Sequence, residues 1–159
     1  MMSDLIREID VMDNNEALQV LSLQLASYRI EADVIGFNDL PPLKDTFSSL
    51  RKSGQTFCGF FVEGVLAGCS AYSRENNIVH VCRMMVHPDF FRQGIADSLL
   101  TYIEEQESDG HQFMVTAVIN NLPAVRLYEK HGYKQGDKWE IIPGMIMAKY
   151  VRTVFPKGG

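Results

Sequence analysis

The feature that most constrains the fold of this sequence is the stretch 84–103, which reads as a buried strand, a glycine loop and the start of a helix. The strand must end at Pro88, because proline cannot donate to a strand ladder. After Gly94, apolar residues recur at the spacing of one helix face: Ile95, Leu99, Tyr102 and Ile103. A helix that starts directly after such a loop presents unpaired N–H groups and the positive end of its dipole. The stretch predicts a phosphate or pyrophosphate site, with an ordinary strand-to-helix turn as the alternative.

Composition limits the partners that this chain is expected to have. Its 159 residues carry a formal net charge of −5, so we expect no nucleic-acid binding. No apolar run of about eighteen residues occurs, so we expect no membrane span. The first residues lack the basic and apolar regions of a signal peptide, which favours a cytoplasmic protein.

The number and spacing of the cysteines and histidines predict neither disulfides nor a metal site. Cys58, Cys69 and Cys82 are an odd number without C-x-x-C spacing, which predicts reduced thiols that are buried as small apolar residues. No group of His and Cys residues has the spacing of metal ligands, so we expect no metal site. The phosphate-loop pattern G-x-x-x-x-G-K-[ST] and the dinucleotide pattern G-x-G-x-x-G are both missing.

Two runs of residues resemble a known family. Residues 86–100, V-H-P-D-F-F-R-Q-G-I-A-x-x-L-L, resemble motif A of the GNAT superfamily, the acetyl-CoA-dependent N-acetyltransferases. Residues 121–133, N-L-P-A-V-R-L-Y-E-K-H-G-Y, resemble its motif B, N-x-x-A-x-x-L-Y-x-x-x-G-[FY]. The resemblance covers about residues 56–150. The family loop usually has Gln or Arg three positions before its glycine, where this sequence has Phe91 followed by Arg92.

Hydrophobic spacing and turn residues predict the order of the elements. We expect strands at 4–11, 56–62, 65–73, 78–87, 112–118, 133–140 and 143–150, and helices at 13–28, 43–54, 94–107 and 121–131. Residues 29–42 show no clear period and are expected to form a loop, and residues 151–159 a frayed tail.

This order matches the GNAT fold, so the resemblance implies the architecture. That architecture is an α/β (α+β) domain over residues 1–159 with a mixed sheet of about seven strands and helices on both faces. An antiparallel meander comes first, and a central parallel pair, 78–87 and 112–118, splays apart. In the family the pantetheine arm of the cofactor lies between these two strands.

The resemblance also implies where acetyl-CoA binds. Backbone N–H groups at the start of the third helix would hold the pyrophosphate: Arg92, Gln93, Gly94, Ile95, Ala96 and Asp97. A backbone N–H in the strand segment Met84, Met85 and Val86 would bind the thioester oxygen, where a preorganised donor is worth about 3 kcal/mol. Asn121 matches the asparagine that contacts the pantetheine arm, and it is also suited to cap the following helix.

Proton transfer requires an acid and a base. The family places its acid, which protonates the leaving thiolate, at the position of Tyr128; the alternative is a core aromatic residue. An alkyl amine is almost fully protonated at pH 7, so a base is expected. His80 has a suitable intrinsic pKa and would share a face with Cys82 and Met84 if the strand is regular. The competing base is Glu31 or Asp33 acting through water, while His111 and His131 read as surface residues.

These patterns predict an enzyme that transfers the acetyl group of acetyl-CoA to a primary amine. The alternative is a non-catalytic module that only binds acyl-CoA. Between residues 29 and 45, Glu31, Asp33, Asp39 and Asp45 outnumber Arg29 and Lys44, which predicts a cationic acceptor if this segment lines the cleft. A small cationic amine or a protein amine would fit, and a solvated acidic loop is the alternative. We expect a monomer or a homodimer.

Overall fold

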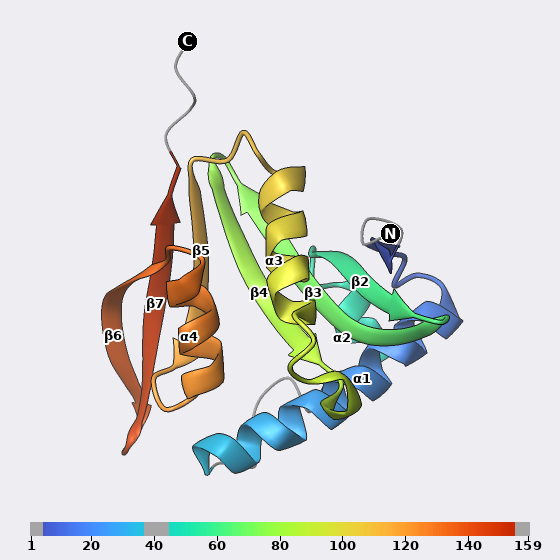
Figure 1. Cartoon of the computed structure of the whole chain (residues 1–159), viewed down its shortest axis with the longest axis horizontal. Coiled ribbons are helices and arrows are strands. Elements are labelled where there is room, and N and C mark those ends of the chain that lie inside the picture. Colours follow the sequence, from blue (N-terminus) through green and yellow to red (C-terminus); the bar gives the residue numbers. More distant parts are fainter. Residues whose placement is uncertain (1–4, 37–44, 155–159) are drawn as a thin grey trace.

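The computed structural model describes residues 5–36 and 45–154 and shows one mixed sheet between helices (Figure 1). In chain order the elements are β1 (Ile6–Ile9), α1 (Asn14–Ile35), α2 (Phe47–Arg51), β2 (Thr56–Val62), β3 (Val65–Glu75), β4 (Ile78–Val86), the 3₁₀-helix η3 (Pro88–Phe90), α3 (Ile95–Gln106), β5 (Gln112–Val118), α4 (Leu122–Lys130), β6 (Lys134–Ile142) and β7 (Met145–Thr153). The predicted succession of strands and longer helices is confirmed.

The seven strands lie in the order β1-β2-β3-β4-β5-β7-β6. β4 pairs with β5 in parallel, and every other neighbouring pair of the described sheet is antiparallel. The parallel pairing covers only Ile78–Val81 against Gln112–Val115, although both strands continue beyond it. From that point the strands diverge (Figure 1), as the resemblance to the GNAT fold implied.

Two groups of buried residues hold the helices against the sheet. On one face, Leu99, Leu100 and Ile103 of α3 and Tyr128 of α4 pack in one apolar cluster. On the other face, α1 contributes to a second cluster, which includes Met85 of β4. The sheet is therefore covered on both faces, and the helices of both faces reach the gap between β4 and β5.

Helix α1 is longer than the sequence suggested. Asp13 caps it, since its carboxylate accepts the N–H of Glu16 at 2.9 Å. The helix runs through residues 29–35 to end at Gly36, so the expectation of a loop there was wrong; residues 37–42 lie outside the described part. The apolar residues Ala17, Leu18, Leu21, Leu25 and Tyr28 were expected to form the buried stripe of this helix, but Leu18 and Leu25 are exposed.

The buried face of α1 instead includes Val20, Gln24, Tyr28 and Ala32. A search for regularly spaced apolar residues misses this face, because one of its core positions is occupied by the polar side chain of Gln24. Hydrogen bonds satisfy this side chain: its amide donates to Asp45 at 2.7 Å and accepts from Arg83 at 2.8 Å.

A bulge in β4 changes which side chains share a face. Val81 pairs with Tyr72 and Arg83 with Ala71, so Cys82 has no partner of its own in β3. The bulge therefore separates His80 from Met84, which would share a face only in a regular strand. It also exposes Cys82, whereas Cys58 and Cys69 are buried as predicted.

The C-terminal strands extend past the predicted end. β7 continues to Thr153, and Val154 donates its N–H to His111 O at 2.8 Å, so residues 151–154 are not a frayed tail. Residues 155–159 lie outside the described part of the chain. Among the described helices, none has the length and apolar character needed to span a membrane.

Candidate active site

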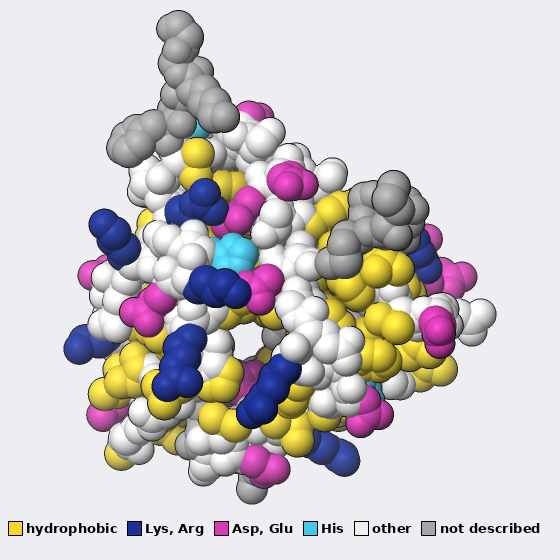
Figure 2. All heavy atoms as spheres, in the orientation of Figure 1, with side chains coloured by type: hydrophobic (Ala, Val, Ile, Leu, Met, Phe, Trp, Pro, Cys, Tyr) yellow, Lys and Arg dark blue, Asp and Glu magenta, His cyan; other side chains and the backbone are white. Residues whose placement is uncertain are grey.

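A cavity of about 570 Å³ lies where β4 and β5 separate. It is lined by α1, the end of β4, the loop before α3 with the first turn of that helix, and α4. Figure 2 shows a hollow in this face of the molecule with Lys and Arg side chains on both sides. The cavity brings together these predicted site residues: Met84, Met85, Val86, Arg92, Gly94, Ile95, Ala96, Asp97, Asn121 and Tyr128. Gln93 is exposed and does not line it.

The loop before α3 is built for close approach of an anion. Gly94 precedes the helix with a φ of 74°, and no side chain caps the helix start. Arg92 also has a positive φ, 64°, a conformation that costs a non-glycine residue about 1–2 kcal/mol. The N–H groups of the first turn are therefore left for a ligand, and a strained residue beside them is typical of functional loops.

Close packing fixes the position of this helix start. Gly68 of β3 lies under Ile95, and a Cβ atom at Gly68 would come within 2.5 Å of Ile95 Cγ2. Ile95 itself is buried. The first turn of α3 is thus held at a distance from the sheet that only a glycine in β3 permits.

Asp97, in the first turn of α3, would repel a phosphate if its charge were free. Its carboxylate oxygen Oδ1 instead lies 3.0 Å from Lys130 Nζ and 3.0 Å from His131 Nε2. Burial works against the ionised form, but the hydrogen bonds from these two residues lower the pKa of Asp97. His131 is therefore not the surface residue that we predicted, since it joins α4 to α3.

The end of β4 offers unpaired backbone groups to the cavity. Its pairing with β5 stops at Val81, while its pairing with β3 continues to Val86. The edge of Met84, Met85 and Val86 that faces β5 is consequently without a strand partner in the described sheet. These are the residues expected to bind the thioester oxygen and an extended chain.

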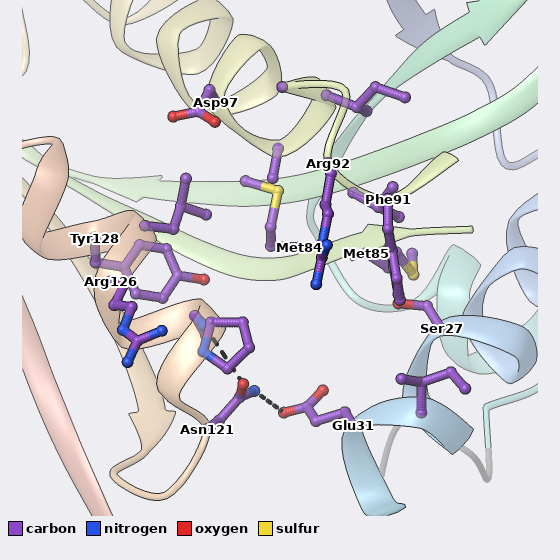
Figure 3. A pocket seen from close by; sticks show the side chains of 18 of the residues that line it. Ser27, Glu31, Met84, Met85, Phe91, Arg92, Asp97, Asn121, Arg126 and Tyr128 are labelled. Atoms are coloured by element: carbon purple, nitrogen blue, oxygen red, sulfur yellow. Dashed lines mark hydrogen bonds between the residues drawn. The ribbon is translucent and has the colours of Figure 1, made fainter. Parts of the chain in front are cut away.

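Tyr128 combines a buried ring with an available hydroxyl. The residue is 4% exposed, and its ring lies beside those of Tyr133 and Tyr150. Figure 3 shows its hydroxyl pointing into the cavity toward Met84, and within the described residues it has no hydrogen-bond partner. Burial, and then the charge of Glu31, raise its pKa, so the hydroxyl stays protonated at neutral pH. The packing suits a core aromatic residue, whereas the free hydroxyl suits an acid.

Asn121 and Glu31 meet across the mouth of the cavity (Figure 3). Asn121 Nδ2 donates to Glu31 Oε1 at 3.1 Å, while Asn121 Oδ1 accepts the N–H of Ala124 at 3.4 Å and caps α4. Burial raises the pKa of Glu31, and the hydrogen bond from Asn121 partly offsets this. The bond links α1 to α4, two helices that cover opposite faces of the sheet.

A second, smaller cavity of about 80 Å³ continues from the first along the diverging strands. Both cavities share five lining residues: Glu31, Met84, Asn121, Ala124 and Tyr128. The smaller cavity also reaches Cys82 at the bulge and Thr116 of β5. The polar groups of Glu31, Asn121 and Tyr128 therefore stand at the junction of two spaces.

A polar cluster supports the floor of the smaller cavity. The guanidinium of Arg83 forms an ion pair with Asp45 and donates to Gln24 at 2.8 Å and to Gln55 at 2.8 Å. Burial opposes the charge of Asp45, but hydrogen bonds from Arg83, Ser49 and Gln24 lower its pKa. Asp45 is thus neutralised by Arg83 and contributes no net negative charge to the cavity.

The other proposed bases fall outside both cavities. His80 lies within the paired part of β4, opposite Ser73 and Met114, and lines neither space. Asp33 is exposed on α1 and lines neither space either. Asp39 lies outside the described residues. Among the acidic residues of segment 29–45 that the structure describes, only Glu31 lines the junction.

The sequence did not predict that α1 would form a wall of the site. Ser27, Ile30 and Val34 line the large cavity beside Glu31, although residues 29–34 were expected in a loop. Ala32, four residues after Tyr28, was the available signal that the helix continues. Arg126 of α4, which motif B leaves unspecified, lines the cavity as well.

Among the described residues, no cluster of His, Cys, Asp and Glu could hold a metal ion.

This fold agrees with comparisons to known proteins. Residues 54–135 match the model of the acetyltransferase (GNAT) domain. The chain therefore belongs to the GNAT acetyltransferase family. It is also 30% identical over 141 residues to the UPF0157 protein YqkA of Bacillus subtilis (strain 168). That match covers 89% of this chain but 40% of YqkA, so the chain spans about two fifths of the length of this relative.

Solved structures share the fold at low sequence identity. The ribosomal-protein-S18-alanine N-acetyltransferase of Escherichia coli is similar with a TM-score of 0.75 and 14% identity, over 96% of this chain and 95% of that chain. The PaiA N-acetyltransferase of Thermoplasma acidophilum, solved in complex with coenzyme A, is similar with a TM-score of 0.70 and 14% identity, over 91% of this chain and 96% of that one. These likenesses establish the fold.

Proposed function

We propose that this protein transfers the acetyl group of acetyl-CoA directly to a primary amine, either a small cationic amine or an amine of a protein or peptide. The observation that carries the proposal is the position of the Tyr128 hydroxyl in the cavity. Its buried phenol presents a hydroxyl that has no hydrogen-bond partner in the described part of the chain, and it does so in the cavity that also holds the uncapped start of α3 and the free edge of β4. Binding, activation and proton donation are therefore available within one space.

The loop before α3 suits the pyrophosphate of the cofactor. The uncapped N–H groups of the first turn supply donors, and Gly94 lets the backbone approach closely. Arg92 and Arg126 line opposite sides of the cavity (Figure 3), and in the described structure neither is paired with a carboxylate. Their charges compensate for Phe91, which stands where the family usually has Gln or Arg.

The diverging strands suit the rest of the cofactor. An extended pantetheine arm would pair with the free edge of β4 as an added strand, and Asn121 lies opposite that edge to contact it. A backbone N–H within Met84–Val86 would then donate to the thioester oxygen as negative charge develops there. Because these donors are backbone groups of a paired strand, they require little reorganisation during the reaction.

Tyr128 is the proposed acid. When the carbon–sulfur bond breaks, the departing thiolate needs a proton or a strong hydrogen bond. The raised pKa of Tyr128 keeps its hydroxyl protonated, so the donor is in place at working pH. Its ring is fixed between Tyr133 and Tyr150, which holds the hydroxyl in one position.

We also propose a cytoplasmic location and a monomeric or homodimeric state. The buried thiols Cys58 and Cys69 remain unpaired, as suits a reducing compartment. The acidic balance of the chain, −5, makes nucleic acid an unsuitable partner.

The test combines binding with turnover. Isothermal titration calorimetry should detect acetyl-CoA binding, and a thiol assay should detect free CoA when primary amines are added. If the protein does not bind acetyl-CoA, the proposal is wrong. Tight binding without release of CoA for any amine would instead identify a non-catalytic acyl-CoA-binding module, the reading that Phe91 supports.

A further inference from the structure

We propose that Glu31 is the catalytic base and the anchor for the acceptor, and that the acceptor is an alkylammonium group without a neighbouring carboxylate. This inference rests on the proposed acetyl transfer and assigns the acceptor side of the same site. It replaces His80, which lines neither cavity.

The position of Glu31 is the first argument. It is one of the five residues shared by the large and small cavities, together with Met84 on the free edge of β4 and the acid Tyr128. A nitrogen held by this carboxylate therefore lies between the two spaces, next to the strand that binds the thioester. The smaller cavity, about 80 Å³, has room for a few non-hydrogen atoms beyond that point.

The charge of Glu31 is the second argument. Among the described residues that line either cavity, the carboxylates are Glu31 and Asp97. Asp97 is paired with Lys130 and His131, while Glu31 has no cationic partner among the described residues. Within residues 5–36 and 45–154 its hydrogen bond comes from an amide, so this partly buried carboxylate is an incomplete ion pair, and an ammonium group completes it.

The surroundings of Glu31 define the acceptor further. Ile30 and Val34 line the large cavity on the same helix and are 38% and 49% exposed, so they offer apolar surface to a carbon chain beside the ammonium. A carboxylate next to the acceptor nitrogen would instead meet the charge of Glu31. The site therefore favours alkylamines, polyamines and lysine side chains over α-amino acids.

Asn121 holds the carboxylate in place. Its amide N–H binds Glu31 Oε1, which leaves the second carboxylate oxygen for the acceptor. The burial that raises the pKa of Glu31 makes the carboxylate a stronger base than an exposed one. Tyr28, Tyr128, Cys82 and Arg83 line the same small cavity, and Arg83 is already neutralised by Asp45.

The proton balance is complete with these groups. Glu31 takes one proton from the ammonium, and the neutral nitrogen forms its bond to the thioester carbon. The carbon–sulfur bond then breaks, its electron pair leaves on sulfur, and Tyr128 protonates the thiolate. The second proton of the nitrogen restores the phenol, and Glu31 releases its proton to solvent. One ammonium and one thioester yield one amide, one thiol and one proton.

The experiment compares Glu31→Gln with Asp33→Asn, a matched change at an exposed residue of the same helix that lines neither cavity. Glutamine keeps an acceptor for Asn121, so the fold is preserved. Each protein is titrated with acetyl-CoA and assayed at pH 7 for CoA release with butylamine, spermidine, a lysine-bearing peptide and glycine, the acceptor that carries a neighbouring carboxylate. Hydroxylamine serves as an acceptor that is already neutral at this pH, after subtraction of its uncatalysed reaction.

We expect Glu31→Gln to bind acetyl-CoA normally and to lose about 10²- to 10⁴-fold in kcat/KM for the alkylamines. Its activity with hydroxylamine should fall far less, because that acceptor needs no base, and Asp33→Asn should match wild type throughout. Full alkylamine activity in Glu31→Gln, an equal loss with both kinds of acceptor, or a wild-type preference for glycine over butylamine would overturn the inference. Wild type that releases no CoA with any acceptor would instead defeat the proposed function.

Discussion

The two sides of the central cavity are built from different parts of the chain. One side, the donor wall, consists of the β4 edge and the α3 start, residues 84–97, and it offers mainly backbone N–H groups. The other side, the acceptor wall, consists of α1 and α4 and offers side chains, chiefly Glu31, Asn121 and Tyr128. The donor wall is therefore specified by backbone shape, and the acceptor wall by residue identity.

This difference separates what is general from what is particular in the molecule. Backbone donors recognise a diphosphate and a thioester whichever side chains surround them, so the donor wall suits one common cofactor. Side chains determine which amine fits, so a single substitution on the acceptor wall can change the substrate. Four predictions test this division, from the largest expected effect to the smallest.

Substitution of Gly94 by Glu should abolish acetyl-CoA binding. The residue has a φ of 74°, so a side chain adds strain of about 1–2 kcal/mol, and its charge would lie beside the pyrophosphate. Wild type should gain about 2.7 kcal/mol of stability at a hundredfold excess of acetyl-CoA over its Kd, and the variant none. Gly64→Glu, with a φ of 81° in the β2–β3 turn, is the control for strain and should bind normally. If both variants bind acetyl-CoA equally well, the backbone N–H groups at the start of α3 do not bind the cofactor.

Substitution of Tyr128 by Phe should lower turnover by about 10²- to 10⁴-fold with little change in acetyl-CoA affinity, because only the hydroxyl is lost. Steady-state kinetics and calorimetry measure the two effects separately. Tyr133→Phe is the matched control, since its ring packs 5.9 Å from that of Tyr128 but its hydroxyl donates to Glu104. The control should lose about 1 kcal/mol of stability and keep its turnover. An unchanged rate in Tyr128→Phe would mean that Tyr128 is a core aromatic residue and not the acid.

Substitution of Gly68 by Ala should destabilise the fold by about 1–3 kcal/mol, because its Cβ atom would lie 2.5 Å from Ile95 Cγ2. The helix start must shift to relieve this contact, so acetyl-CoA affinity should fall as well. Gly136→Ala in β6 is the control, since the nearest atom to its Cβ would be 3.6 Å away. Denaturant unfolding measures the stability and calorimetry measures the affinity. Normal affinity in a destabilised variant would show that cofactor binding does not depend on the exact position of the α3 start.

Substitution of Glu31 by Gln should make the free protein slightly more stable at pH 7. Burial raises the pKa of Glu31 in the folded state, so folding favours its neutral form. The wild type therefore loses stability relative to the variant as the pH rises from the unfolded-state pKa through the folded-state pKa, and the two should converge at lower pH. Thermal unfolding between pH 4 and 8 checks this sign. A variant that is less stable at pH 7 would give Glu31 a structural role.

The sequence predicted the donor wall better than the acceptor wall, because the donor wall depends on local sequence and the acceptor wall on long-range contacts. Pro88, Gly94 and the apolar residues after them specify a strand end, a turn and a helix through local chemistry alone. The position of Glu31 depends on the length of α1, whose buried Gln24 satisfies its amide through Asp45 and Arg83, distant in the sequence. Such a long-range contact leaves no periodic signal in a single sequence.

The bulge in β4 was equally hidden. A regular strand would place His80 and Met84 on one face, and the extra residue at Cys82 separates them. Nothing local in this run of residues marks the bulge, because it arises from the pairing of β3 with β4. The proposed base, Glu31, therefore required the structure, whereas the proposed acid, Tyr128, followed from the resemblance of residues 121–133 to motif B.

The short ladder between β4 and β5 has a consequence for the motions of the molecule. The two parts of the sheet are joined by the pairs from Ile78–Gln112 to Val81–Val115. Past these pairs, the amides on the edge of β4 that faces β5 have no partner in the described sheet. These amides should exchange with deuterium quickly in the free protein, although the other edge of the same strand pairs with β3 up to Val86. A ligand that fills the gap acts as a missing strand. It would slow their exchange and make two loosely coupled parts unfold as one cooperative unit.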